Sequence, residues 1–228
     1  MINASDNTVS SINQLSDDSK RFYLGNESAK KRLLILGNSI TKHGPKKEIG
    51  WEYDWGMAAS KRENDYVHLL QSHLDLDGFN VYTMVRQAAT WENNFANGSE
   101  ILDHFKKERD FKADVILFRL GENVHLFDSQ INAERFYETI KDLIEFLSKK
   151  DTKVLFTTCF WKSDLVNESI KRAAVELKFP CLELSALSQL PNAMATGKFW
   201  HEGVQMHPSD VGMKEIEKTI YPQLIKLL

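Results

Sequence analysis

The sequence predicts an α/β protein, a three-layer α/β/α sandwich around a five-stranded parallel sheet. Two observations predict it: short continuous apolar runs recur along the chain, and helix-like spacing of apolar residues fills the stretches between them. Continuous rather than alternating apolarity is typical of strands that are covered on both faces, as in parallel sheets. Strands that alternate with helices form βαβ units with right-handed crossovers.

Five apolar runs are the expected strands. They span residues 33–36, 79–85, 115–118, 154–156 and 181–184. Helical spacing predicts helices around residues 67–74, 102–105 and 137–147 and from residue 209 onward, where Pro222 is expected to kink or interrupt the helix. Residues 1–30 are rich in Ser, Asn and Asp without a sustained period, so we expect a flexible leader before a single domain over 31–228.

The composition fits one domain with a full core, since 42% of the 228 residues are hydrophobic. The 29 basic and 32 acidic side chains are interspersed and give a net charge of −3, so no nucleic-acid partner is expected. No apolar run approaches the roughly 20 residues that span a bilayer. The start lacks a secretory pattern, which favours a cytoplasmic protein as the sequence stands, or a secreted or periplasmic one if a signal peptide was removed. The distant Cys159 and Cys181 fit no metal-ligand spacing and are expected to be ordinary buried thiols.

Small polar residues stand where ligands bind in such sheets, at the carboxyl ends of the strands. Ser39 follows the first strand in "LILGNSIT", and Asn123 follows the third in "FRLGENVH". His207 lies before the last helix in "HEGVQMHPSD". Each has an ordinary interpretation, as a helix cap, a turn residue or a packed imidazole. Together they could supply a nucleophile, an oxyanion donor and a general base at one edge of the sheet.

In this order and at this spacing, the motifs resemble those of the SGNH hydrolases, also called GDSL esterases and lipases. Residues 37–39 (Gly-Asn-Ser) match the family's Gly-Asp-Ser, residues 121–123 (Gly-Glu-Asn) its Gly-x-Asn-Asp, and residues 207–208 its His-Pro. The resemblance covers most of the chain from Lys31 onward. It implies the flavodoxin-like SGNH hydrolase fold and hydrolysis of a small acyl ester, such as an acetyl ester of a carbohydrate. The reaction would proceed through an acyl-enzyme on Ser39, without cofactor or metal.

The resemblance also implies site roles, with three departures from the family pattern. Ser39 would be the nucleophile and His207 the base, but Val204 stands where the triad Asp is expected. Either Glu202 orients the imidazole, or the site is a Ser–His dyad. The oxyanion donors would be the Ser39 amide, the Asn123 side chain and a block-two amide that belongs to Ala88 or Ala89 in place of glycine. The third departure is Asn38 in place of the usual Asp.

Several other features have competing interpretations. Trp55, Trp91 and Trp200 either form a substrate surface or pack their loops onto the domain. Arg86 and Arg119 are expected first as ion-pair partners of nearby carboxylates. The segment "HEGVQMH" lacks the histidine spacing of a zinc protease. The alternatives to an esterase are a non-catalytic carbohydrate-binding or regulatory protein on the same fold and, more remotely, a nucleotide-binding protein. The oligomeric state is left open.

Overall fold

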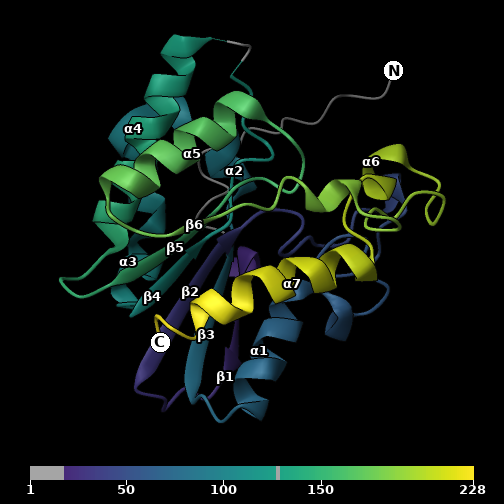
Figure 1. Cartoon of the computed structure of the whole chain (residues 1–228), viewed down its shortest axis with the longest axis horizontal. Coiled ribbons are helices and arrows are strands. Elements are labelled where there is room, and N and C mark those ends of the chain that lie inside the picture. Colours follow the sequence, from purple (N-terminus) through teal and green to yellow (C-terminus); the bar gives the residue numbers. More distant parts are fainter. Residues whose placement is uncertain (1–17, 127–128) are drawn as a thin grey trace, which may run out of the picture.

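The computed structural model describes residues 18–126 and 129–228, and its centre is a six-stranded sheet of order β1-β3-β2-β4-β5-β6 (Figure 1). Neighbouring strands from β3 to β6 along this order are parallel, which confirms the predicted sheet type. The strands are β1 (Arg21–Gly25), β2 (Lys31–Gly37), β3 (Val81–Gln87), β4 (Val115–Phe118), β5 (Lys153–Thr157) and β6 (Cys181–Leu182).

The sixth strand corrects the sequence prediction. Arg21–Gly25 pairs antiparallel with β3, so the segment 18–25 is not the leader that its composition predicted, while residues 1–17 lie outside the described residues. The Arg21 Nε donates to Glu108 Oε1 at 2.5 Å, and Arg86 Nε lies 3.3 Å from the same buried oxygen. The Arg21–Glu108 ion pair links the edge strand to a distant part of the chain, and the five residues of β1 alone give no sign of it.

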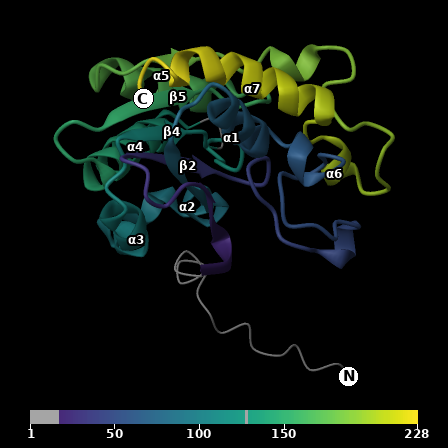
Figure 2. The same ribbon diagram turned by 90° about the horizontal axis from the view of Figure 1, so that it is seen from below.

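Helices cover both faces of the sheet (Figures 1 and 2). One face carries α2 (Ala89–Asn93), η5 (Phe95–Phe105), α3 (Lys106–Asp110), α4 (Gln130–Leu147) and α5 (Asp164–Glu176). The other face carries α1 (Tyr66–Leu76) and α7 (Asp210–Leu224), which lie side by side. Helix α7 continues through Pro222, so the expected interruption is wrong; the proline falls in the last turn of the helix.

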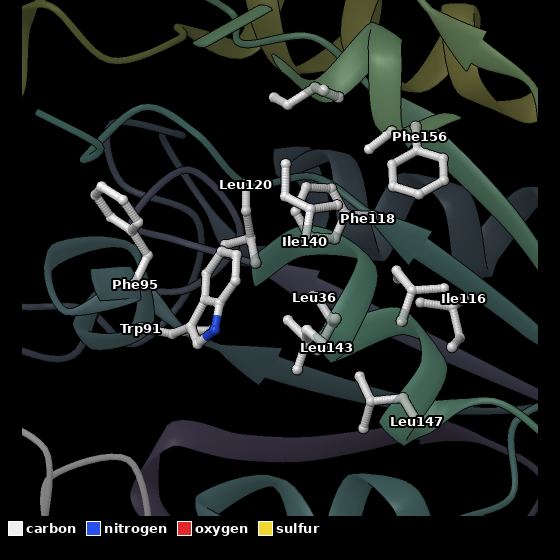
Figure 3. Close-up of a cluster of buried hydrophobic side chains, with 14 of the residues drawn as sticks. Leu36, Trp91, Phe95, Ile116, Phe118, Leu120, Ile140, Leu143, Leu147 and Phe156 are labelled. Carbon is white, nitrogen blue, oxygen red and sulfur yellow. The ribbon is translucent and has the colours of Figure 1, made fainter. Parts of the chain in front are cut away.

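The alternating side chains of β2 explain why its apolar run is continuous. Leu34 and Leu36 pack with α4 and with Trp91 and Phe118 in the cluster of Figure 3, whereas Leu33 and Ile35 pack with α1 and α7. The strand is therefore buried on both faces, as its sequence predicts. Among the described residues, no helix is long and apolar enough to cross a membrane.

A third, smaller core joins the loop after β2 to the segment before α7. The loop after β2 contains η3 (Lys47–Ile49) and η4 (Arg62–Asn64), and the segment before α7 contains η6 (Leu187–Gln189) and α6 (Glu202–Gln205). Trp51 and Met57 of the first loop are buried against Ala195 and Val204 of the later segment. This packing brings the residues that follow β2 next to those that precede α7.

Candidate active site

The turn after β2 presents Ser39 at the carboxyl end of the sheet. A Cβ at Gly37 would lie 1.8 Å from the Thr41 Oγ1, so the chain can turn this tightly only with glycine there. The Asn38 carbonyl then accepts from the amides of Thr41 (3.0 Å) and Lys42 (2.9 Å). The turn leaves the Ser39 side chain half-buried and directed at the loop before α7.

That loop supplies His207, and the two predicted partners are in contact. The Ser39 Oγ lies 2.8 Å from the His207 Nε2, across 168 positions of sequence. The backbone of the loop is fixed because the His207 carbonyl accepts from the Ala195 amide at 2.9 Å and Ser209 caps α7. The Trp161 ring meets the imidazole edge-on, with centroids 5.4 Å apart. Sequence reasoning missed this tryptophan, which lies beyond the end of β5.

The other imidazole nitrogen fixes the tautomer. His207 Nδ1 lies 2.7 Å from the Gly203 carbonyl oxygen, which can only accept, so Nδ1 carries the hydrogen and Nε2 offers its lone pair to Ser39. The expectation that the Glu202 carboxylate orients the ring is wrong in this geometry, because its exposed side chain makes no hydrogen bond to His207. Desolvation lowers the pKa of His207 to about 4, only partly opposed by the Gly203 carbonyl.

The amides that could bind an oxyanion are those of Ser39 and Ala89. The predicted Ala88 amide is already used, since it donates to the Gly37 carbonyl at 2.7 Å, and this corrects its assignment. Ala89 begins α2 and lines the cavity that contains Ser39. Neither the Ser39 nor the Ala89 amide has an acceptor among the described residues. The alternative of Ala89 over Ala88 is therefore the one that the geometry favours.

The Asn123 side chain lines the same cavity, and a buried carboxylate holds its amide. Asn123 Nδ2 donates to Glu92 Oε2 at 2.6 Å, which leaves its second hydrogen for a ligand. Glu92 Oε1 also accepts from the Gly121 amide at 2.5 Å. Burial raises the pKa of Glu92, and the nearby charge of Glu122 acts in the same direction. Sequence reasoning missed Glu92, because only the folded chain brings it from α2 to the end of β4.

Asn38 occupies the space between two carboxylates. Its Nδ2 donates to Glu92 Oε1 (3.0 Å) and to Glu122 Oε2 (2.6 Å), and its Oδ1 accepts from Arg119 Nη1 (3.1 Å) and from the Ile40 amide (3.2 Å). Every hydrogen-bonding capacity of the amide is therefore used. This accounts for the departure from Gly-Asp-Ser, since an aspartate would lack both donors and would face two carboxylates.

The two arginines before the rim are ion-paired, as predicted. Arg119 binds the Glu122 carboxylate through Nη2, and Arg86 pairs with Glu108. Both arginines and both carboxylates are almost fully buried. Neither arginine lines the cavity at Ser39.

The cavity at Ser39 has a volume of about 290 Å³ and also contains Ala89, Asn123, Gly203 and His207 in its lining. Within residues 18–126 and 129–228, no group of three or more His, Cys, Asp or Glu side chains could hold a metal ion. The cysteines Cys159 and Cys181 are both free.

The three candidate tryptophans differ in their environments, and none lines the cavity. Trp91 is fully buried in the core against Phe118 and Phe136, so its assignment to the substrate surface is wrong (Figure 3). Trp55 is half-buried, stacks on Tyr53 and donates to the Ala59 carbonyl, which is a packing role. Trp200 is 69% exposed beside His201, a lining residue.

Solved structures similar to this chain include esterases and lipases. The chain is similar to a lipase/acylhydrolase from Enterococcus faecalis, with a TM-score of 0.58, 16% identity and coverage of 85% of this chain and 95% of that one. It is also similar to the psychrotrophic esterase EstA from Pseudoalteromonas sp. (TM-score 0.56, 12% identity, 86% and 98% coverage). A two-domain esterase active on acetylated mannans gives a TM-score of 0.56 at 16% identity, over 86% of this chain and 50% of that one. No family model and no curated protein matches the sequence.

These likenesses confirm the predicted fold class, the three-layer fold of the SGNH-type esterases and lipases, with one strand more than expected. The sequence motifs and the structural neighbours thus indicate the same fold.

The environment of Asn38 generates a stability prediction. Asn38→Asp should lower the free energy of unfolding at pH 7 by about 3 kcal/mol, because it removes the two donors to Glu92 and Glu122 and places a third carboxylate beside them, next to the single guanidinium of Arg119. Urea denaturation measures the loss. Asn97→Asp, at an exposed asparagine, is the matched control and should change stability by less than about 0.5 kcal/mol. Equal stabilities of the Asn38→Asp variant and the wild type would contradict this, because they would show that a third carboxylate beside Glu92 and Glu122 costs no stability.

Proposed function

We propose that the protein is a serine esterase that hydrolyses a small acyl ester through an acyl-enzyme on Ser39, with His207 as general base. The observation that carries the proposal is the 2.8 Å contact between the serine Oγ and the imidazole Nε2, with Nδ1 held by a backbone carbonyl. A protein that only binds a carbohydrate has no need of this tautomer or of free amides beside the serine. The geometry therefore favours the hydrolase over the binding protein.

The reaction begins when Ser39 Oγ attacks the acyl carbonyl carbon and its proton passes to His207 Nε2. The negative charge on the former carbonyl oxygen is stabilised by the amides of Ser39 and Ala89 and by Asn123 Nδ2, a kind of donor typically worth about 3 kcal/mol. His207 then gives its proton to the departing alkoxide, and the C–O bond of the ester breaks. Water, deprotonated by the same imidazole, attacks the acyl-enzyme and releases the carboxylic acid and the serine.

We take Glu92 to be a positioning residue in this scheme. Its carboxylate fixes the Asn123 amide at 2.6 Å and also accepts from Asn38, directly before the nucleophile. A preorganised donor loses no energy in reorienting as the oxyanion forms, which is how such donors accelerate acyl transfer.

The substrate we infer is a short acyl ester, such as an acetyl group carried by a carbohydrate. The cavity of about 290 Å³ at Ser39 fits a small acyl group. A structural neighbour is active on acetylated mannans, and Trp200 offers an exposed ring beside the lining residue His201. Aromatic faces of this kind pack against apolar faces of ligands.

The nucleophile assignment is tested by covalent labelling. Wild-type protein should react with a serine-directed phosphonate and hydrolyse 4-nitrophenyl acetate, whereas Ser39→Ala should lose labelling and at least about 10³-fold in kcat. Mass spectrometry locates the label. Ser28→Ala, at an exposed serine outside the cavity, is the matched control and should label normally. Labelling that persists in Ser39→Ala would exclude Ser39 as the nucleophile.

The pH profile is tested through kcat/KM, which reports the ionisation of the free enzyme. The pKa of His207 is lowered to about 4, so the neutral base is present at all higher pH and is lost only as the pH falls through that value. The rate should therefore stay level from about pH 6 to 8 and fall in acid with a midpoint well below 6.5. Circular dichroism at each pH separates this loss from unfolding. A midpoint at or above 6.5 would contradict the assigned environment of His207.

Substitution of Glu202 tests whether a carboxylate orients the His207 ring. Glu202→Gln should change kcat less than about twofold, because its side chain does not contact the ring, whereas His207→Ala should lose at least about 10³-fold. Steady-state kinetics on one ester compare both. A tenfold fall in kcat at constant KM in Glu202→Gln would restore Glu202 as the orienting acid.

A further inference from the structure

A second cavity opens beside the one that holds Ser39. Its volume is about 540 Å³, and it shares His43, Lys46 and Gln87 with the lining of the first cavity. The two cavities therefore adjoin across these three side chains. A substrate whose acyl group lies at Ser39 can extend its alcohol part past them into the larger space.

The lining of this second cavity is strongly cationic. It contains three lysines, Lys20, Lys42 and Lys46, and one acidic residue, Asp54. The Asp54 carboxylate is paired with Arg62, whose Nη2 lies 2.8 Å from Oδ1. The Asp54 carboxylate thus already has a partner, and three lysines line a space large enough for a sugar.

Lys42 distinguishes this cavity from an ordinary patch of solvated lysines. The residue is only 9% exposed, and its Nζ donates to the backbone carbonyl of Asp54 at 3.0 Å and lies 5.3 Å from the centre of the Phe22 ring. Among the described residues, no carboxylate is within ion-pair distance of this ammonium group. Burial lowers the pKa of Lys42, because the charged form loses solvation that the nearby Asp54 charge only partly replaces. A bound anion would supply the missing countercharge.

We propose that the second cavity binds an anionic group, a carboxylate or a phosphate, on the alcohol part of the substrate. The inference rests on the proposed function and deepens it: the ester is carried by an acidic or phosphorylated sugar rather than by a neutral one. Lys42 and Lys46 bind the anion, and the acyl carbonyl then lies in the adjoining cavity at Ser39.

The test measures equilibrium binding by NMR titration of the full-length protein with glucuronate, glucose 6-phosphate and glucose. At least one of the two anions should bind about tenfold or more tightly than glucose, and the tighter anion tells carboxylate from phosphate. Raising the salt concentration from 0.05 to 0.5 M should reduce the preference.

Variants assign the effect to the cavity. Lys42→Met should remove most of the preference for the anion and Lys46→Ala about threefold of it, whereas Lys42→Arg should retain it. Lys47→Ala is the matched control, since Lys47 is an exposed neighbour that does not line the cavity, and it should bind as the wild type does. Should Lys42→Met fail to fold, Lys46→Ala and the salt series still decide.

A kinetic measurement connects the cavity to the reaction. The ratio of kcat/KM for an acetylated sugar that bears the tighter-binding anion to that for the matching acetylated glucoside should exceed about 10 and should fall in the Lys46→Ala variant. Equal binding of glucose and both anions, no measurable binding of either anion, or a preference that survives both Lys42→Met and Lys46→Ala would overturn the inference. Binding without turnover of any ester would instead overturn the esterase proposal alone.

Discussion

The side-chain amide of Asn38 lies between two buried carboxylates, and the arrangement of the strand ends at the site depends on it. Glu92 arrives from the helix after β3 and Glu122 from the turn after β4, and each would cost several kcal/mol to bury unpaired. The Asn38 side chain donates to both, and Arg119 neutralises Glu122. The three strand ends are thereby joined beneath Ser39, and through Glu92 the same contacts fix the Asn123 amide. The proposed nucleophile and a proposed oxyanion donor therefore depend on the same set of buried contacts.

The His207 ring is oriented by a backbone carbonyl, and not by a carboxylate as in a Ser-His-Asp triad. A carboxylate on Nδ1 would favour the imidazolium and raise its pKa, whereas the Gly203 carbonyl carries no charge and leaves desolvation dominant. The imidazole is consequently neutral over a wide range of pH, but its low pKa makes it a weak acceptor of the serine proton. Such a base matches an ester, whose alkoxide leaves more readily than an amine. The missing triad acid thus alters the strength of the base and keeps its geometry.

Local pattern was sufficient to predict the parallel sheet, the helices on its two faces and the approach of Ser39 to His207. It was insufficient wherever a tertiary contact decides. The β1 strand is held by the ion pair of Arg21 with Glu108, 87 positions away. Ala89 rather than Ala88 is the candidate oxyanion donor because the Gly37 carbonyl accepts a hydrogen bond from the Ala88 amide. The proposed role of Glu92 depends on its burial. Glu202 was the plausible orienting acid by spacing alone, but the short helix that it begins presents a backbone carbonyl to the imidazole instead.

In the reaction that we propose, the two adjoining cavities would have different tasks, one the chemistry and the other the binding of the alcohol part. The groups at Ser39 act on charge that appears only as the carbonyl is attacked, and interactions of this kind raise kcat. On our proposal, the lysines of the second cavity would meet a charge that is present in the substrate throughout, so their contribution would be equal in the ground state and the transition state and would lower KM. Lys46 lines both cavities and stands at their junction. On this proposal, selectivity for the alcohol part can change by substitution of lysines while the Ser39–His207 pair, which other contacts hold, stays the same.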